Sequence, residues 1–267
     1  MIYNFRIFLR KIIVNLLYFL KIKEMTFEQL LINKTIKNTN IIFDIGANYG
    51  QTVDKFLLTE KKLFFYIFEP HKKYFLFLKK KFKTLQNIKI FNVGVGKKTE
   101  SKYFYSTKNK KHQYAYSFNK ATYLENKKKV KIISLDDNFL KLKKINFLKI
   151  DVEGLEYEVL CGSQKILKKN QPFLFLEVTS GSIDKCFKLL ENLNFEIKVY
   201  EYSIFNKPNL GWSKGNVINS NIYDKKFYNI NNFLKKKNKE FVLNLFIYPH
   251  KKKNYFKNYS TNSIKFP

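Results

Sequence analysis

The stretch that decides the fold reads Ile41-Ile42-Phe43-Asp44-Ile45-Gly46-Ala47-Asn48-Tyr49-Gly50-Gln51-Thr52. Its apolar start is typical of a parallel strand that is buried on both faces, and we expect a helix to begin near Thr52. Between them, Gly46 and Gly50 allow backbone angles and close approaches that a Cβ would block. The loop therefore predicts backbone N–H groups and a helix N-terminus that face a ligand, with Asp44 as an acceptor at the strand's end. An ordinary tight turn between a strand and a helix is the alternative.

A second apolar strand is predicted at residues 64–68, and it also ends in an acid, Glu69, followed by Pro70. An acidic residue at the end of the second strand of a βαβ unit usually holds a ribose diol. The spacing from Asp44 to Glu69 suits both dinucleotides and S-adenosylmethionine (SAM). The loop lacks G-x-G-x-x-G and instead reads Gly46-x-Asn48-x-Gly50, which favours SAM over a nicotinamide cofactor.

Three blocks of the sequence resemble the FkbM family of SAM-dependent methyltransferases. They are residues 43–50 (F-D-I-G-A-N-Y-G), residues 68–70 (F-E-P) and residues 149–154 (K-I-D-V-E-G), with further matches at 134–137 and 156–162. The likeness covers residues 40–180 and continues more weakly to about residue 249. It implies an α/β class I methyltransferase fold, which is a Rossmann-like three-layer sandwich. Its seven-stranded, mostly parallel sheet has an antiparallel last strand.

The resemblance also implies which residues contact SAM. Glu69 would accept both ribose hydroxyls, and the loop after Asp44 would hold the methionine part, while Asp151 would lie near the reactive methyl. The full set of predicted cofactor contacts is Asp44, Gly46, Ala47, Asn48, Gly50, Thr52, Glu69, Pro70, Val93 and Asp151.

Methyl transfer to a hydroxyl benefits from a general base, and the candidates are Asp151, Glu153 and Glu177. Glu153 has an alternative role in capping the helix predicted to start near Leu155, and Glu177 could instead bind loop backbone. Paired carboxylates can also hold a divalent cation, but we predict no metal site. The predicted reaction is O-methylation of a sugar, glycan or small metabolite.

The composition of the chain bears on a second class of methyl acceptor, nucleic acid. The chain of 267 residues carries 51 Lys and Arg against 21 Asp and Glu, a formal net charge of +30. Such a charge fits nucleic acid or an anionic membrane, but the arginines that bidentate phosphate recognition prefers are only Arg6 and Arg10. The joint abundance of Lys, Asn, Ile, Phe and Tyr is as expected when AT-rich codons dominate a genome, and a functional basic surface is the alternative. No N-P-P-Y-type tetrapeptide follows the strand predicted at 145–150. We therefore expect no nucleic-acid acceptor, and keep a nucleic-acid methyltransferase and a non-catalytic scaffold as alternatives.

Three regions are predicted along the chain. Residues 1–36 form a basic amphipathic helical segment, residues 37–249 the methyltransferase domain, and residues 250–267 a basic tail. Residues 2–23 either pack on the domain or lie on a membrane surface. The two cysteines, Cys161 and Cys186, predict neither disulfides nor metal ligation, which favours the cytoplasm.

An insertion resembling a β-hairpin is predicted at residues 97–131, near the active site, where such loops set specificity. Its candidate substrate contacts are His112, Tyr114, Tyr116 and Ser117. The long loop at 205–240, with Trp212, is a second candidate functional region. The remaining predicted elements are strands at 88–93, 145–150, 173–176, 195–202 and 241–248 and helices at 71–83, 155–167 and 183–193.

Overall fold

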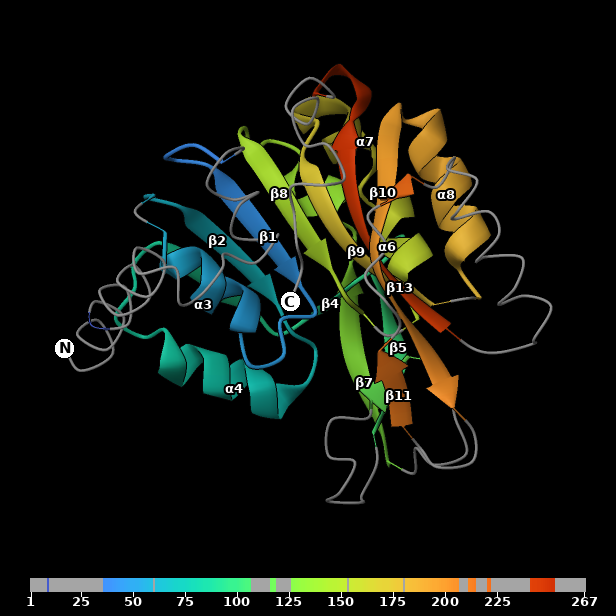
Figure 1. Cartoon of the computed structure of the whole chain (residues 1–267). Helices are drawn as coiled ribbons and strands as arrows, with labels where there is room; N and C mark the ends of the chain where they lie inside the picture. Colours follow the sequence, from blue (N-terminus) through green and yellow to red (C-terminus); the bar gives the residue numbers. More distant parts are fainter. Residues whose placement is uncertain are drawn as a thin grey trace.

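The computed structural model describes residues 9, 36–59, 61–106, 116–118, 126–152, 154–179, 181–206, 211–214, 220–221 and 241–252 (Figure 1). Several predictions lie outside these residues: nearly all of the N-terminal segment, Glu153, His112, Tyr114 and most of the C-terminal tail. The side chains of Tyr116, Ser117 and Trp212 also lie outside the description.

The main sheet confirms the predicted seven-stranded, mostly parallel architecture. Its strands run in the order β10-β13-β9-β8-β1-β2-β3. Their bounds are β1 (Ile41–Ile45), β2 (Phe64–Phe68), β3 (Ile88–Phe91), β8 (Ile145–Ile150), β9 (Phe173–Thr179), β10 (Phe195–Asn206) and β13 (Phe241–Pro249). The last strand, β13, pairs antiparallel with both β9 and β10. Two short strands, β11 (Gly211–Lys214) and β12 (Ser220–Asn221), extend the sheet from β10.

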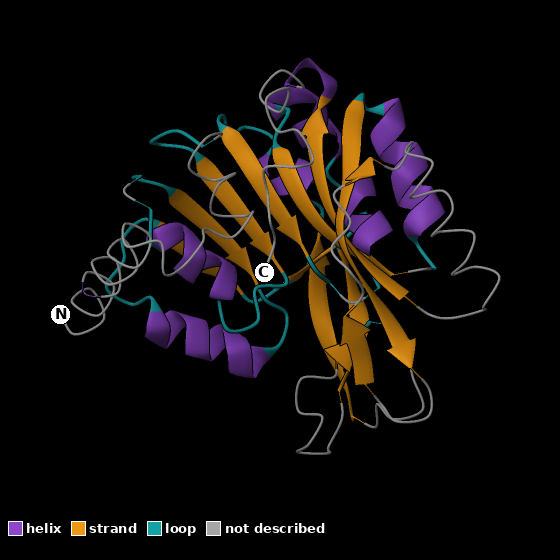
Figure 2. Cartoon of the chain, viewed as in Figure 1, coloured by secondary structure: helices purple, strands orange, loops and turns teal. Residues whose placement is uncertain are grey.

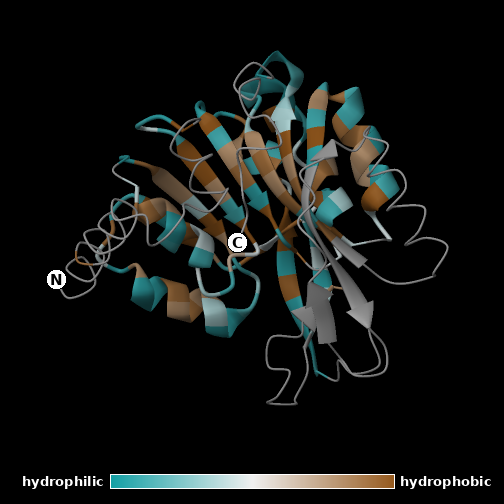
Figure 3. Cartoon of the chain, viewed as in Figure 1, coloured by the Kyte–Doolittle hydropathy of each residue, from teal (hydrophilic) through white to brown (hydrophobic). Residues whose placement is uncertain are grey.

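Both faces of this sheet are covered by helices, so its central strands are mostly apolar (Figures 2 and 3). Asp44 in β1 and Lys149 in β8 are charged exceptions. Within β1, Ile42 belongs to one buried cluster, whereas Phe43 belongs to the other. The cluster around Ile42 takes in side chains of two helices, α3 (Gln51–Leu57) and α4 (Lys72–Lys81). The cluster around Phe43 takes in side chains of α5 (Leu135–Phe139), α6 (Glu156–Cys161), α7 (Gln164–Asn170) and α8 (Ile183–Asn192). The three-layer sandwich predicted from the sequence is thereby confirmed.

Two helices, α6 and α7, replace the single helix predicted for residues 155–167. The helical path breaks at Gly162, where a Cβ would lie only 2.1 Å from the carbonyl oxygen of Gly96. The Gly162 carbonyl accepts the N–H of Asp136 at 2.9 Å. The Asp136 carboxylate in turn accepts two N–H groups at the start of α7, each at 2.9 Å. Hydrogen bonds from residues distant in sequence therefore satisfy backbone groups at the end of α6 and the start of α7. The amphipathic pattern of the sequence does not reveal these hydrogen bonds.

The predicted strand at 88–93 is shorter than expected, because the chain leaves the main sheet after Phe91. The Asn92 side chain donates to the carbonyls of Glu69 and Pro70 at 2.9 and 3.0 Å, which fixes the turn. The chain then enters a second, four-stranded sheet in the order β4-β7-β5-β6. Its strands are β4 (Gly94–Val95), β5 (Glu100–Ser106), β6 (Tyr116–Ser117) and β7 (Asn126–Ile133). Within the predicted insertion, β5 pairs antiparallel with both β7 and β6.

Two further observations concern the described part of the chain. None of its helices has the length and apolar character needed to cross a membrane. Cys161 and Cys186 are free thiols, and Cys186 is buried in α8.

Candidate active site

A cavity of about 170 Å³ lies at the carboxyl ends of β1, β2 and β8. In open α/β sheets this edge is where ligands bind. Residues that follow each of the three strands line it, including Gly46 after β1, Glu69 after β2 and Asp151 after β8. The second sheet closes one side with Phe104 of β5 and with Phe118.

Glu69 is a buried carboxylate that two backbone groups hold in place. Its Oε2 accepts the N–H of Asn48 at 2.8 Å, and its Oε1 accepts the N–H of His71 at 2.7 Å. Only 1% of the residue is exposed. Burial raises the pKa of Glu69 to about 7, although the two backbone hydrogen bonds act in the opposite direction. Each oxygen keeps acceptor capacity for a ligand hydroxyl in the cavity.

The loop after β1 has a backbone that glycine makes possible. Gly46 has φ +81°, and a Cβ there would lie 1.8 Å from the carbonyl oxygen of Asp151. Asn48 also has a positive φ, 51°, a conformation that asparagine adopts more readily than most residues. The Gly46 N–H donates to the Phe68 carbonyl at 3.0 Å, which ties the loop to β2. The loop therefore packs closely against the backbone of Asp151, which directly follows β8.

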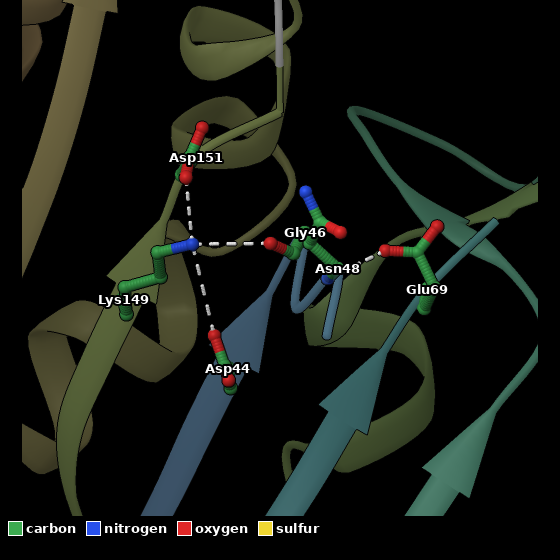
Figure 4. Close-up of polar contacts among 6 residues, drawn as sticks. All are labelled: Asp44, Gly46, Asn48, Glu69, Lys149 and Asp151. Atoms are coloured by element: carbon green, nitrogen blue, oxygen red, sulfur yellow. Dashed lines mark hydrogen bonds and ion pairs between the residues drawn. The ribbon is translucent and has the colours of Figure 1, made fainter. Parts of the chain in front are cut away.

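Lys149 joins two carboxylates and one carbonyl at the base of the cavity (Figure 4). The β1–β8 register pairs Lys149 with Asp44. The Lys149 Nζ lies 2.8 Å from Asp151 Oδ2, 3.0 Å from the Gly46 carbonyl oxygen and 3.9 Å from Asp44 Oδ1. Asp44 is fully buried, and neither of its oxygens accepts a hydrogen bond from the described residues. Burial raises the pKa of Asp44 to about 6, and the Lys149 cation opposes this rise.

The family of the chain follows from its sequence match. Residues 44–197, more than half of the chain, match the family described as "Methyltransferase FkbM domain". The chain belongs to this family. It is accordingly a SAM-dependent methyltransferase.

Solved methyltransferase structures resemble this FkbM chain only distantly. The precorrin-6y C5,15-methyltransferase of Geobacter metallireducens has 11% identity and a TM-score of 0.43, covering 83% of this chain and 87% of that one. A putative rRNA-methylase of Clostridium thermocellum has 8% identity and a TM-score of 0.45, with 83% and 93% covered. A SAM-dependent O-methyltransferase of Thermotoga maritima has 10% identity and a TM-score of 0.39, with 84% and 63% covered. The sequence matches no curated protein.

The FkbM cavity brings together six of the ten predicted cofactor contacts. Its wall includes Gly46, Asn48, Glu69, Pro70, Val93 and Asp151. The other four, Asp44, Ala47, Gly50 and Thr52, are not among the lining residues. Ala47 is buried in the apolar cluster that contains α3, and Gly50 packs on α4, where its Cβ would meet Leu78 and Phe82 at 2.9 Å. The glycine at position 50 therefore serves helix packing in this structure.

The three base candidates have different positions. Asp151 lines the cavity, and 31% of its side chain is exposed. Glu177 does not end its strand as predicted, because β9 continues to Thr179 through pairing with β13. The β8–β9 register pairs Lys149 with Phe175, so Glu177, two residues further along β9, lies on the same face of the sheet as Lys149. It is not among the residues that line the cavity. Glu153 lies outside the described residues.

Sequence reasoning missed four residues of this site. Lys149 and Glu156 lie within the motifs at 149–154 and 156–162, and neither is predicted to contact a ligand. Glu156 is 1% exposed and accepts the Gly154 N–H at 2.7 Å, which holds the loop that follows Asp151. Phe104 and Phe118 belong to the predicted insertion, whose predicted substrate contacts are His112, Tyr114, Tyr116 and Ser117. In the described residues no group of three or more His, Cys, Asp or Glu side chains is placed to hold a metal ion.

Proposed function

We propose that the protein transfers a methyl group from SAM to a hydroxyl of a sugar, a glycan or another small metabolite. The observation that carries this proposal is Glu69, whose two oxygens are oriented by backbone N–H groups at the wall of the cavity. A carboxylate held in this way matches the two neighbouring hydroxyls of a ribose.

The rest of the cavity supports a fit to SAM. Apolar side chains line the side next to Val93, and the rings of Phe104 and Phe118 pack there with centroids 4.9 Å apart. A Cβ on Gly94 would lie 3.0 Å from the Phe118 ring, so this glycine leaves room for the ring to approach. We assign the adenine to this aromatic wall, since flat apolar surfaces suit a heteroaromatic ring.

Asp151 is the carboxylate that we assign to the reacting end of the cavity. Bound SAM supplies an electrophilic methyl group on a sulfonium cation. The partly exposed Asp151 carboxylate provides negative charge toward that cation and accepts a proton from an incoming hydroxyl. Because its Oδ2 already binds Lys149, Oδ1 is the oxygen left for this task. Glu153 remains the alternative base.

Two experiments test the proposal with the full chain. Calorimetric titration should show binding of SAM and of S-adenosylhomocysteine but not of NAD. Methyl-labelled SAM should then transfer label to a pool of oligosaccharides and hydroxylated metabolites, and the label should survive alkali, as a methyl ether does and a methyl ester does not. Glu69→Ala serves as the control in which both signals weaken. Label that enters only RNA would overturn the acceptor class, and absence of SAM binding would overturn the proposal entirely.

A further inference from the structure

Lys149 is a charged side chain at the base of the cavity whose contacts come from three separate segments. Its Nζ has three N–H donors, and the structure offers it three oxygens, from Asp151, Gly46 and Asp44 (Figure 4). Only 18% of its side chain is exposed. Burial by itself would lower the pKa of Lys149, but Asp151 and Asp44 outweigh burial and raise the pKa above the usual value. The two carboxylates therefore favour the cationic form of the Lys149 side chain.

The distances separate two possible roles for this cation. Neutralising the charge of the buried Asp44 requires only that a cation lies nearby. The distance from Lys149 Nζ to Asp44 Oδ1, 3.9 Å, is the longest of the three. The two short contacts, 2.8 and 3.0 Å, go to the Asp151 carboxylate and the Gly46 carbonyl, both of which belong to residues lining the cavity. These two oxygens are negative or partly negative and repel each other unless a donor joins them.

We propose that Lys149 is a positioning residue that fixes the loop at 46–50 and the Asp151 carboxylate relative to each other at the base of the cavity. The packing makes this coupling tight, because Gly46 leaves no room for even a Cβ next to the Asp151 backbone. Lys149 itself does not line the cavity and acts through the two groups that do. The part that concerns SAM affinity rests on the proposed function, whereas the coupling of the two segments does not.

The test combines three variants with one matched control. Lys149→Met removes the cation and leaves Asp44 buried without it, so we expect a lower unfolding midpoint. Adding Asp44→Asn removes the unpaired charge and should restore much of the midpoint. Lys149→Arg keeps the charge but replaces a compact ammonium with a larger planar fork. Lys252→Met is the control, because Lys252 also donates to a carbonyl, that of Gln171 at 2.6 Å, and is partly buried away from the cavity.

Amide hydrogen exchange, measured without ligand, reports the coupling directly. In Lys149→Met/Asp44→Asn we expect exchange at residues 46–50 and at Val152 and Gly154 to rise at least tenfold. Exchange in β9 should stay unchanged, and Lys252→Met should match the parent protein throughout. Calorimetry should show that SAM affinity falls at least tenfold in the double variant and in Lys149→Arg.

The outcomes decide between the two roles. If the double variant regains stability, slow exchange and SAM affinity together, Lys149 only neutralises Asp44 and the proposal is wrong. Parent-like exchange and affinity in Lys149→Arg would also overturn it, because charge alone would then suffice. If the parent protein binds no SAM, the proposed function fails, and the exchange data still show whether Lys149 couples the two segments.

Discussion

Asp44 and Glu69 are two buried carboxylates at the ends of neighbouring parallel strands, and their surroundings differ. Their exposures are 0% and 1%, and burial raises both pKa values, to about 6 and about 7. Asp44 lies near the Lys149 cation and accepts no hydrogen bond from the described residues. Glu69 accepts one backbone N–H on each oxygen.

The difference shows how burial can be compensated in two ways with different consequences. At β1 and β8, the nearby Lys149 cation compensates the buried Asp44 by charge, while its hydrogen bonds go to the Gly46 carbonyl and the Asp151 carboxylate. Neutral backbone donors orient a carboxylate and leave lone pairs toward the cavity, as at β2. We therefore regard the β1–β8 side as the rigid base of the site and the β2 side as its ligand-binding wall.

The largest effect should come from crowding the rigid base. Gly46→Ala places a Cβ 1.8 Å from the Asp151 carbonyl oxygen, in a backbone with φ +81°, so the two strand ends must separate. We expect the free energy of unfolding to fall by about 3 kcal/mol or more, from overpacking and backbone strain together. Urea unfolding measures this change. Gly181→Ala is the control, since nothing lies within 4 Å of its added Cβ. A loss of under 1 kcal/mol at Gly46 would show that the base is not rigid.

On the ligand-binding wall, Glu69→Ala should weaken SAM binding by about 1.5–3 kcal/mol, roughly 10–150-fold, because charge-assisted hydrogen bonds are lost. Calorimetry measures the dissociation constant, and S-adenosylhomocysteine serves as a second ligand with the same ribose. Both ligands should weaken by a similar factor, since Glu69 is assigned to the ribose. An unchanged dissociation constant would show that Glu69 does not bind the ribose. Glu69 would then differ from Asp44 in its hydrogen bonds but not in ligand binding.

The sequence predicted the strands of this site better than the roles of its residues. Phe64–Phe68 and Ile145–Ile150 have the predicted bounds, because apolar runs buried on both faces leave a clear local pattern. The role of Lys149 depends instead on the β1–β8 register, which places it beside Asp44 from more than a hundred residues away. The break at Gly162 likewise depends on the backbone of Gly96. Local pattern cannot reveal contacts of this kind.

The pH dependence should separate ligand binding from stability. Glu69 has its pKa raised to about 7, and only its ionised form accepts two ribose hydroxyls fully. We expect SAM affinity to rise about tenfold from pH 6 to pH 8, as the carboxylate loses its proton. Titration calorimetry at several pH values measures this rise. Glu69→Gln should bind more weakly and show a flat profile over the same range.

Stability should change in the opposite direction over part of this range. The folded pKa values of Asp44 and Glu69 lie above their ordinary values of 3.8 and 4.5, so the folded state binds more protons than the unfolded state. Their contribution to stability is full below about pH 4 and is lost as pH rises through about 6 and 7. Urea unfolding of the ligand-free protein checks this, and Asp44→Asn should remove the lower part of the trend. A contribution from these groups that grows with pH would contradict the raised pKa values.

The smallest effect should come from Thr52, which the sequence predicted as a cofactor contact. Thr52 is the second residue of α3, a helix without a side-chain cap, and it is not among the residues that line the cavity. Thr52→Ala should therefore change the SAM dissociation constant by less than about twofold and the free energy of unfolding by less than about 0.5 kcal/mol. Calorimetry and urea unfolding measure the two quantities. A tenfold weaker SAM complex would mean that the α3 N-terminus moves onto the ligand, and the ligand-binding wall would then extend from β2 to the helix that follows β1.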